Sequence, residues 1–562
     1  MSITVFTVLT VRQTIFSLRC FLTIVIRMKV MLIQPPIEDF YDTSIRTYPL
    51  GLLYAGTRIG TIADVVLFDA RTGIKPQSLP GHEFAELKPY YQEDIYTPFS
   101  FFSKYSRFGM PAVEIKKMIA HERPHIVGIA SMCSAYERQT LEVAEAAKQV
   151  DSEIVTVLGG IHATLFPEHL LSNPCVDYCI RGEGETPFFE LVSALSSGAS
   201  GKLTSIPGLC FKEAESFHVV KASFEREIGL VPDRRLIDPD RYRINKKRYT
   251  FFLTSRGCPF SCGFCGKPES PYRKRSLASI EKEIHDCANL GIEAIDFEDD
   301  MLNLDKKTFA SVLRLIAGKG FTLSAMNGIY PGNVDGPTLE LMHAAGFRRL
   351  NFSLVDTSES VLLRQKRRLQ PSFVQLLPYL EASPFLVEVH FIIGLPGQRP
   401  KELIDTLLFL MGKRLLIGPS IFYLSPGSPL HRSIGRTPIP FQSMRSSFML
   451  PFNPYFPRTV TFTFVKLVRF INYVKQVLDR QTGITRMSDL LDHKVTGKDG
   501  RKEIIIRRLL IEKRFACYDL HRHDFRDEAV DASLVRAFFQ KAEGARIKGF
   551  KTGNSLLVDV RE

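Results

Sequence analysis

The residues whose types and spacing are best suited to chemistry are three cysteines in one short stretch. Cys258, Cys262 and Cys265 have the spacing CxxxCxxC and directly follow an apolar, strand-like run. Three thiolates on one loop can hold three irons of a 4Fe–4S cluster, whose full complement is four cysteines. The fourth iron is then open to a substrate or cofactor. The spacing therefore predicts an iron–sulfur cluster with one open iron.

A zinc site and a chance group of structural thiols are the alternatives. Zinc sites typically contain two CxxC pairs or a Cys/His set, and the next cysteine here, Cys287, stands alone in a helical pattern. The segment contains Gly and Pro instead of core periodicity, which disfavours buried structural thiols. The cluster is the favoured interpretation.

The segment Ser-Arg-Gly-Cys-Pro-Phe-Ser-Cys-Gly-Phe-Cys-Gly resembles the signature of the radical S-adenosylmethionine enzymes. In that family the open iron binds the amino and carboxylate groups of S-adenosylmethionine, and an aromatic residue usually stands where Phe264 stands. The resemblance implies that the reduced cluster cleaves S-adenosylmethionine to methionine and a deoxyadenosyl radical, which takes a hydrogen atom from an unactivated carbon. The protein would bind and orient the cofactors and exclude water and oxygen.

The elements that must position the cysteines begin near Arg248, where strand-like runs alternate with helical patterns. Strands are expected at Tyr249–Thr254, Ala294–Phe297, Thr322–Ala325, Arg349–Leu354, Val387–Gly394 and Ser420–Leu424. Helices are expected at Ser276–Leu290, Lys306–Lys319, Gly336–Ala345, Ser358–Arg367 and Pro400–Lys413. Six such units fit a partial (β/α)6 barrel, the fold of the family resembled. Active groups of such barrels lie at the carboxyl ends of strands, and the cysteines follow the first strand.

Three successive carboxylates, Glu298, Asp299 and Asp300, follow the second of these strands. Such a cluster is costly unless it meets cations or hydrogen-bond donors. The resemblance implies that this loop contacts the methionyl ammonium of S-adenosylmethionine. A solvated acidic loop is the alternative.

Two further loops carry candidate contacts to S-adenosylmethionine on the resemblance alone. Ser353 and Asp356 lie at the end of the fourth strand, where relatives place polar groups that reach the ribose and the carboxylate, although the usual Gly and Glu are missing. Gly394 and Pro396 belong to a Gly-Leu-Pro-Gly element that allows the backbone to approach the adenine.

A second series of strands and helices precedes the barrel. Strands are expected at Lys29–Gln34, Asp64–Phe68, His125–Ser131, Glu153–Leu158 and Val176–Ile180. Short buried strands that alternate with helices favour a Rossmann-like parallel sheet, which binds ligands outside the carboxyl ends of its strands. Small residues in the loops there let backbone amides approach an anionic ligand, and tight turns are the alternative explanation for them.

The pattern VLGGIHAT…FPEHLL…VDYCIRGEGE resembles the cobalamin-binding domain attached to many radical S-adenosylmethionine enzymes. The resemblance implies cobalamin contacts from Ser131, Gly159, Gly160, His162, Ala163, Gly182, Glu183 and Gly184. The Asp-x-His-x-x-Gly motif that supplies a histidine to cobalt elsewhere is absent, and His162 does not replace it. Some relatives keep this fold without the cofactor. Where cobalamin is present, methylcobalamin would deliver a methyl group to the carbon radical, although relatives also catalyse cyclisations and ring contractions.

The domain boundaries are read from these patterns. We expect an N-terminal extension of unknown role at 1–27, a cobalamin-binding domain at 28–205, a linker at 206–245, the barrel at 246–440 and a mostly helical C-terminal domain at 441–562. Polar residues interrupt the apolar run of the extension, so it is too short to span a bilayer. No signal-peptide cleavage pattern follows it.

The C-terminal region carries two features with open interpretations. His521 and His523 could ligate a metal or be structurally bonded. The basic amphipathic helix expected at Phe462–Leu478 could lie on a membrane, and packing over the barrel mouth is the favoured alternative.

Composition narrows the function classes. The 562 residues carry a net charge of +13, spread along the chain, and ten cysteines without a disulfide pattern. An oxygen-labile cluster needs a reducing compartment, so we expect the cytoplasm. The expected partners are an unidentified small-molecule or lipid-like substrate and an electron donor such as flavodoxin or ferredoxin, and not nucleic acid.

Two other functions remain open. One is a radical enzyme that modifies tRNA without cobalamin, although Cys133, Cys175 and Cys179 do not match the second cluster that methylthiotransferases need. The other is a non-catalytic cobalamin or redox sensor, which would bind the cofactors without consuming S-adenosylmethionine.

Overall fold

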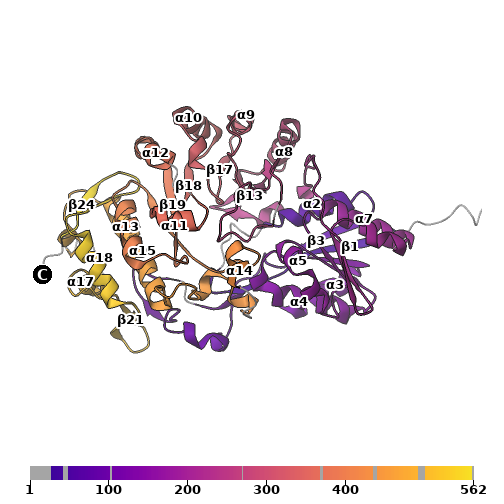
Figure 1. The fold of residues 1–562 in the computed structure, drawn as a ribbon, viewed down its shortest axis with the longest axis horizontal. Helices are drawn as coiled ribbons and strands as arrows, with labels where there is room; N and C mark the ends of the chain where they lie inside the picture. The colour runs from indigo at the N-terminus through magenta and orange to yellow at the C-terminus, as the bar shows by residue number, and fades with distance from the viewer. Residues whose placement is uncertain are drawn as a thin grey trace, which may run out of the picture.

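The structure is a computed structural model that describes residues 27–41, 48–101, 104–268, 270–367, 371–434, 439–491 and 500–559. The predicted extension at 1–27 lies outside these residues except for Arg27. Figure 1 shows the N-terminal sheet and its helices at one end, the barrel strands with their outer helices in the middle, and the C-terminal region at the other end. The predicted fold class is confirmed.

The N-terminal domain is built on a seven-stranded sheet of order β11-β10-β9-β8-β7-β1-β3. Its strands are β1 (Lys29–Gln34), β3 (Asp64–Asp69), β7 (Ile126–Ala130), β8 (Val155–Gly159), β9 (Tyr178–Ile180), β10 (Leu209–Glu213) and β11 (Ser216–Val219). The first five are parallel, and β10 and β11 form an antiparallel hairpin at the edge. Val30 to Ile33 of β1 are fully buried, as expected for a central strand covered on both faces.

Helices cover both faces of this sheet. They are α2 (Leu50–Ile59), α3 (Ala112–Glu122), α4 (Glu137–Val150), α5 (Ile161–Leu165), α6 (Pro167–Leu171) and α7 (Glu185–Ser197). A small sheet of β2 (Ile37–Asp39), β6 (Ser106–Phe108) and β4 (Gln77–Ser78) lies beside the carboxyl end of β1. Because β7, β8 and β9 are neighbours and parallel, the loops that follow them lie next to one another.

The second domain has six parallel strands in chain order, the first three in one sheet and the last three in another. They are β13 (Lys247–Phe252), β16 (Ala294–Phe297), β17 (Thr322–Ser324), β18 (Arg349–Val355), β19 (Leu386–Ile393) and β20 (Leu416–Ile421). Only isolated bridges such as Leu323 to Phe347 join β17 to β18. The antiparallel strand β12 (Arg243–Ile244) extends β13, and the hairpin β14 (Ser255–Arg256) and β15 (Arg273–Lys274) flanks the cysteines.

The helices of the barrel pack outside its strands (Figure 1). They are α8 (Leu277–Asn289), α9 (Lys306–Ile316), α10 (Gly336–Ala345), α11 (Glu359–Arg364), α12 (Pro371–Ala382) and α13 (Pro400–Met411). The apolar strand residues Val387, Val389 and Phe391 belong to the same buried core as residues of α12 and α13. This core forms because alternate strand residues point outward onto the apolar helix faces.

Two details of the predicted barrel are wrong. The sixth strand is Leu416–Ile421 and not Ser420–Leu424, because Gly418 and Pro419 resemble a strand breaker, yet an edge strand tolerates proline. Helix α12 was not predicted, and Pro378 inside it interrupts the helical pattern of the sequence.

The C-terminal region combines helices with short strands. Its helices are α14 (Pro429–Ile434), α15 (Arg458–Leu478), α17 (Gly500–Leu510) and α18 (Ala532–Ala542). Its strands are β21 (Ala516–Asp519), β22 (Asp524–Asp527), β23 (Arg546–Lys548) and β24 (Ser555–Leu557). Strand β21 also pairs with β5 (Ile95–Tyr96) of the N-terminal part.

The basic helix α15 packs in the protein core, but it does not cover the barrel mouth as predicted. It lies beside the edge strand β20, where the Asn472 side chain accepts a hydrogen bond from Ile417 N at 3.1 Å and donates one to Ile417 O at 2.7 Å. The amide group thus satisfies the edge strand as a neighbouring backbone would. This pairing decides the position of the helix.

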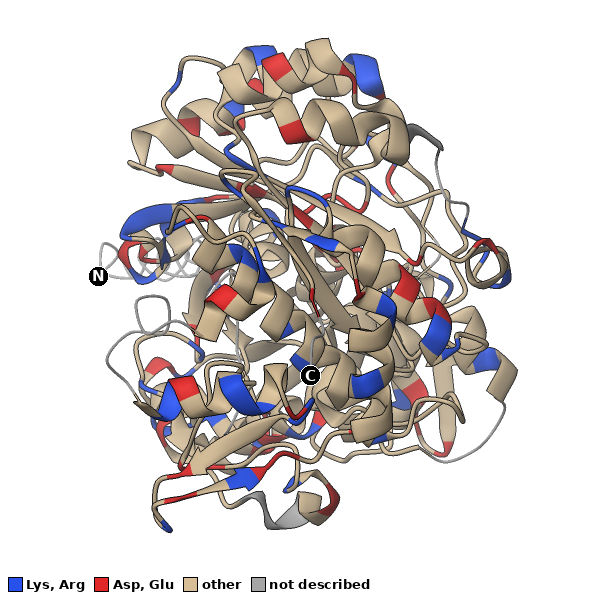
Figure 2. Ribbon diagram, turned by 90° about the vertical axis from the view of Figure 1, so that its left-hand side faces the viewer, with Lys and Arg blue, Asp and Glu red and all other residues tan. Residues whose placement is uncertain are grey.

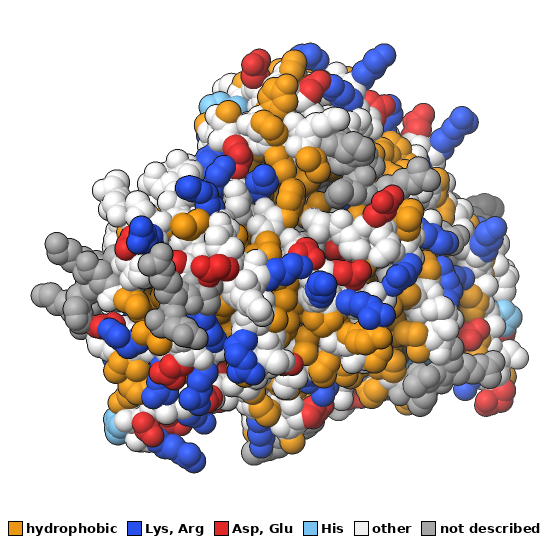
Figure 3. Space-filling model, turned by 60° about the vertical axis from the view of Figure 1, so that its left-hand side comes forward, with side chains coloured by type: hydrophobic (Ala, Val, Ile, Leu, Met, Phe, Trp, Pro, Cys, Tyr) orange, Lys and Arg blue, Asp and Glu red, His pale blue; other side chains and the backbone are white. Residues whose placement is uncertain are grey.

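The prediction of no transmembrane span and no nucleic-acid partner depends on helix length and on the distribution of charged residues. No helix within the described ranges is long and apolar enough to cross a bilayer. Figure 2 shows basic and acidic residues intermixed along the elements. Figure 3 shows hydrophobic side chains gathered between charged ones on one face.

Candidate active site

The cysteine loop leaves the end of β13 and is closed at its base by the β14–β15 hairpin, in which Arg256 pairs with Arg273. Gly257 stands at the start of the loop with φ +84°, and a Cβ there would lie 2.3 Å from Pro271 O. A residue with a side chain would clash with the returning strand, so glycine is required. The sequence therefore places all three cysteines between two ends that are held together.

Two of the predicted acidic residues anchor this loop. Asp299 is fully buried, and its carboxylate accepts hydrogen bonds from the backbone and hydroxyl groups of Thr254 and Ser255 at 2.6 to 3.1 Å. Asp300 accepts a hydrogen bond from Gly257 N at 3.1 Å and forms an ion pair with Lys267. Both carboxylates thus bind the loop that carries the cysteines.

Burial raises the pKa of Asp299, against the hydrogen bonds from Ser255 and Thr254 that lower it. A contact between Asp299 and S-adenosylmethionine stays a prediction. The physical reason against a direct contact is that the side chain has almost no exposed surface and its oxygens already accept hydrogen bonds from the loop.

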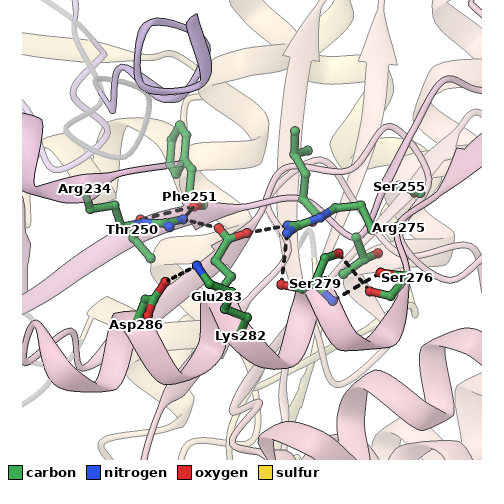
Figure 4. Close-up of polar contacts among 12 residues, drawn as sticks. Arg234, Thr250, Phe251, Ser255, Arg275, Ser276, Ser279, Lys282, Glu283 and Asp286 are labelled. Atoms are coloured by element: carbon green, nitrogen blue, oxygen red, sulfur yellow. Dashed lines mark hydrogen bonds and ion pairs between the residues drawn. The ribbon is translucent and has the colours of Figure 1, made fainter. Parts of the chain in front are cut away.

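A buried triad of charges supports the base of the same loop (Figure 4). Glu283 of α8 binds Arg234 at 2.5 Å and Arg275, which directly follows β15. Arg275 donates to Leu253 O at 2.9 Å, and Arg234 donates to Phe251 O at 2.8 Å. The carboxylate compensates both buried guanidinium groups, so the triad ties the linker and α8 to the end of β13.

The three cysteines lie together on this loop at different depths. Cys262 is buried, Cys258 is partly exposed and Cys265 is exposed, and the three thiols interact electrostatically. In the part of the chain that is described, no three His, Cys, Asp or Glu side chains are arranged to hold a single metal ion. A 4Fe–4S cluster does not need such convergence, because each thiolate binds a different iron. The donor set therefore fits a cluster.

Arg367 is a neighbour of the cysteines that the sequence did not reveal. Its guanidinium donates to Cys262 Sγ at 3.7 Å and to Ser353 O at 3.3 Å. Gly263 N also donates to Gln365 O at 3.0 Å, so the segment after α11 holds the cysteine loop from a second side. A basic residue in a run of basic residues gave no signal that distinguished it from a solvated face.

The predicted S-adenosylmethionine contacts divide by exposure. The Ser353 side chain is exposed, while Glu298 is partly exposed and accepts a hydrogen bond from the Asn327 amide at 2.8 Å. Phe264 is partly buried against an apolar cluster that includes Val355 and Leu395. Glu298 and Phe264 lie on loops that follow barrel strands, and Ser353 lies near the carboxyl end of β18.

Asp356 and Gly394 are linked by a glutamine that the sequence analysis missed. Gln398, which directly follows the Gly-Leu-Pro-Gly element, donates to Asp356 Oδ2 at 2.6 Å and accepts from Gly394 N at 2.7 Å. Asp356 is fully buried, whereas Pro396 of the same element is partly exposed. The Gln398 bridge joins the ends of β18 and β19. Ligand contacts from Asp356, Gly394 and Pro396 stay predictions.

The predicted cobalamin residues lie at the carboxyl ends of the neighbouring strands β7, β8 and β9, where Gly159 ends β8 and His162 and Ala163 belong to α5. Gly160 has φ +122°, and a Cβ there would lie 2.7 Å from Ser131 O. Ser131 and Ala163 are buried, while Gly159 is partly exposed. The hydroxyl of Ser131 has no hydrogen-bond partner in the described structure, which leaves it available to a ligand.

His162 is fully buried, and its contact with cobalamin stays a prediction. Its Nε2 binds Glu137 Oε2 at 2.6 Å, and Glu137 also binds His169. Burial alone would raise the pKa of Glu137, but the hydrogen bonds from the two histidines lower it. The Phe441 ring packs on the His162 ring with centroids 5.0 Å apart. The side chain thus positions the loop, in agreement with the absence of the cobalt-ligand motif.

The loop after β9 is held at both ends of its glycine pair. Gly182 N donates to the Thr164 hydroxyl at 2.9 Å, and Gly184 precedes the first turn of α7. Between them, Glu183 binds Arg273 through two hydrogen bonds and lies 3.4 Å from Arg256. Burial alone would raise the pKa of Glu183, but these arginines lower it.

The three loops fit a large, flat and partly apolar ligand. Met132 and Ile161 expose 56% and 39% of their surface at the ends of β7 and β8. The residues between them have small side chains, which leaves room for a ligand above the strand ends. The Ser131 hydroxyl provides one polar group. Such a combination of apolar surface and few polar groups is typical of cofactor sites. The residues present therefore fit cobalamin.

The histidine pair of the C-terminal region lies apart from these loops. His521 Nε2 binds Asp94 Oδ2 at 3.0 Å, in the contact between β21 and β5. This contact favours the structural interpretation of His521.

Comparisons with family models agree with the two sites. The B12 binding domain model matches residues 108–192, and the Radical SAM superfamily model matches residues 252–410. An uncharacterized methyltransferase of Pyrococcus horikoshii is 28% identical over 72% of this chain and 81% of its own length. Cytidylyl-2-hydroxyethylphosphonate methyltransferase of Streptomyces wedmorensis is 24% identical over 66% of this chain and 73% of its own length.

Solved structures share the fold. TsrM of Kitasatospora setae, a radical S-adenosylmethionine methyltransferase solved with tryptophan and a SAM analog, has a TM-score of 0.56 at 17% identity over 78% of this chain and 88% of its own. The cobalamin-dependent radical enzyme OxsB has a TM-score of 0.57 at 13% identity over 86% and 72%. With the matched family models, the loops described above lead to one conclusion: the chain is a radical S-adenosylmethionine enzyme with an N-terminal cobalamin-binding domain.

Proposed function

We propose that this protein transfers a methyl group from S-adenosylmethionine, through cobalamin, to an unreactive carbon of a small-molecule or lipid-like substrate. The observation that carries the proposal is that the cysteine loop and the cobalamin-side helix α5 both contact the segment 427–430. Leu430 N, at the start of α14, donates to Gly263 O of the cysteine loop at 3.0 Å, and Leu165 of the cobalamin-side helix α5 packs against Gly427. The two cofactors would therefore share one reaction space.

When bound, the cluster supplies the electron that cleaves S-adenosylmethionine, and cobalamin carries the methyl group. The chain itself positions them. Cys258, Cys262 and Cys265 hold the cluster, while Asp299 and the Asp300–Lys267 pair hold their loop. The exposed Met132 and Ile161 provide apolar surface for cobalamin. The buried side chains that anchor these loops hold them in one conformation, so the cofactor sites do not rearrange when only water fills them.

The relatives support methyl transfer over the other chemistries. Two of the relatives reported above carry methyltransferase names, and TsrM is described as a methyltransferase. The match to the B12 binding domain disfavours the tRNA-modifying alternative without cobalamin. The proposal includes a flavodoxin or ferredoxin as electron donor and the cytoplasm as location, since a labile cluster needs a reducing compartment.

The test is anaerobic purification with cobalamin supplied, followed by iron and cobalt analysis and product assay with dithionite. S-adenosylhomocysteine together with deoxyadenosine would support methyl transfer, because the first reports methyl donation and the second reports the radical. Deoxyadenosine alone would indicate another radical reaction. If neither product forms although the cluster is complete, enzymatic turnover is contradicted. The non-catalytic sensor is then the remaining function.

The substitution Cys262→Ala tests the cluster site within the same assay. Removing one of three thiolates should reduce the iron content and the visible cluster absorbance at least about tenfold and abolish deoxyadenosine formation. Cys517→Ala is the matched control, because Cys517 is buried in β21 of the C-terminal region. S-adenosylmethionine cleavage that persists in the Cys262 variant would refute the assignment.

A further inference from the structure

The side chains that join the cobalamin-side loops to the cysteine loop form one ion-pair network. Arg273 donates to Glu183 Oε1 at 2.5 Å and to Glu183 Oε2 at 3.0 Å, and Arg256 binds Glu185 at 2.6 Å. Arg256 also lies 3.4 Å from Glu183. The two acidic residues belong to the N-terminal domain, and the two basic residues belong to the hairpin that closes the cysteine loop.

The geometry of this network is fixed from several sides. The Arg273 side chain is only 8% exposed, and it also donates to Glu225 O at 2.8 Å and to Ser270 Oγ at 3.1 Å. Its guanidinium lies over the Phe224 ring. A bidentate pair in such surroundings holds one orientation, because each guanidinium nitrogen has an assigned acceptor.

The Glu183–Arg273 pair connects the two loops that are predicted to hold the cofactors. Glu183 stands between Gly182 and Gly184, in the loop predicted to contact cobalamin, while Arg273 is opposite Arg256, two residues before Cys258. A pocket next to the pair has walls from the N-terminal domain, from the linker and from Arg256, so the three parts meet there. A movement of either cofactor loop is therefore transmitted to the other.

We propose that Glu183 and Arg273 are positioning residues that hold the cysteine loop in place against the cobalamin-side loop, and that Glu183 acts through Arg273 and not through a contact with cobalamin. The inference rests on the proposed function for the identity of the two cofactors. The ion pair itself is a property of the chain without cofactors, so it is tested first in the apoprotein.

The experiment measures amide hydrogen exchange of the apoprotein across residues 257–268. Gly257, Gly263 and Cys265 each donate a backbone hydrogen bond there, so their exchange reports opening of the loop. Glu183→Gln should raise the exchange rate of this segment at least about tenfold while strand β1 stays protected. Glu183→Asp keeps the charge and should remain within about threefold of wild type.

The matched control is Glu38→Gln. Glu38 pairs with Arg107 at 2.7 Å and is even less exposed than Glu183, but both residues of this pair lie within the N-terminal domain. This variant should leave the exchange of residues 257–268 within about twofold of wild type. Arg273→Gln should reproduce the effect of Glu183→Gln, and the double variant should add little to either single one, because the same interaction is lost.

Three results would overturn the proposal: unchanged exchange of 257–268 in Glu183→Gln, an equal rise in Glu38→Gln, or additive effects in the double variant. A second arm adds hydroxocobalamin. It should slow amide exchange of residues 159–166 in both wild type and Glu183→Gln. Exchange of residues 257–268 should slow only in wild type, because the coupling runs through the Glu183–Arg273 pair. Equal slowing of 257–268 in the variant would also overturn it. If hydroxocobalamin changes neither segment of the wild type, the proposed function fails, and the apoprotein measurements still decide the role of Glu183.

Discussion

At the scale of single residues, the cysteine loop depends on charges that its own motif does not contain. Arg367 donates to Cys262 Sγ, and Lys267 pairs with Asp300 on the other side of the loop. A cation beside a thiolate stabilises negative charge, and reduction makes a cluster more negative. Arg367 is therefore placed to favour the reduced cluster.

The substitution Arg367→Gln should lower the midpoint potential of the reconstituted cluster. Loss of about 1 kcal/mol of favourable charge interaction corresponds to about 40 mV for one electron. Arg364→Gln is the control, since Arg364 lies on the same segment but donates to Gly397 O. The potentials are read by redox titration followed by electron paramagnetic resonance. Equal potentials in wild type and Arg367→Gln would contradict the role of this charge.

At the scale of elements, aspartates cap two of the helices that surround the barrel. Asp305 begins α9 and Asp335 begins α10, and each accepts a hydrogen bond from the backbone three residues later. The hydrogen bond from Lys306, together with those from Thr338, lowers the pKa of Asp335 to about 2. The cap thus joins the start of α10 to α9 through Lys306.

Asp335→Asn should lower the free energy of unfolding at neutral pH and leave it unchanged in strong acid. The folded pKa lies below the unfolded value of about 3.9, so the carboxylate stabilises the fold above that value, and the stabilisation is lost as the pH falls through about 2. Because the side chain is 48% exposed, the difference at pH 7 is about 1 kcal/mol after allowance for solvent screening, and roughly half of it remains at pH 3.

Urea unfolding of wild type and Asp335→Asn between pH 7 and pH 3 measures this difference. Asparagine also caps helices, so the substitution isolates the charge. Glu340→Gln, on the exposed face of α10, should show no such narrowing with pH. If the difference in unfolding free energy between wild type and Asp335→Asn grows toward pH 3, the ionised carboxylate does not stabilise the fold as proposed.

At the scale of the whole molecule, the C-terminal region belongs to the same body as the barrel and the N-terminal domain. Lys475 of α15 is fully buried and donates to Met411 O, Lys413 O and Lys548 O at 2.8 to 3.0 Å. One ammonium thus joins the end of α13 to β23. At the other side, Arg445 lies 3.5 Å from Asp39 of the N-terminal domain.

Lys475→Met should lower the free energy of unfolding by about 2–3 kcal/mol, because three buried carbonyl oxygens lose their donor while the volume is kept. Lys401→Met, on the exposed surface of α13, is the control and should have an effect within about 0.5 kcal/mol. Denaturant unfolding of both variants makes the comparison. If Lys475→Met is as stable as wild type, the ammonium does not hold these elements together.

Much of the fold could be predicted from patterns along the chain. The strands at Ala294–Phe297 and Lys29–Gln34 and the helix at Gly336–Ala345 agree with the prediction to the residue. Each is a continuous apolar or periodic run with clear ends, so local propensity and burial favour the same structure. The sixth barrel strand and α12 were missed because Pro419 and Pro378 make the local signal disagree with the tertiary arrangement.

The sequence by itself determined the reaction class and the sheet ends at which the cofactor loops lie. The spacing of three cysteines is local, and the two βα series order the strands whose ends carry the loops. Only the tertiary structure decided the role of each charged residue. Glu183 and Arg273 are 90 residues apart in the chain, and each finds its oppositely charged partner outside its own loop. Contacts of that kind form only when two domains pack, so no local pattern encodes them.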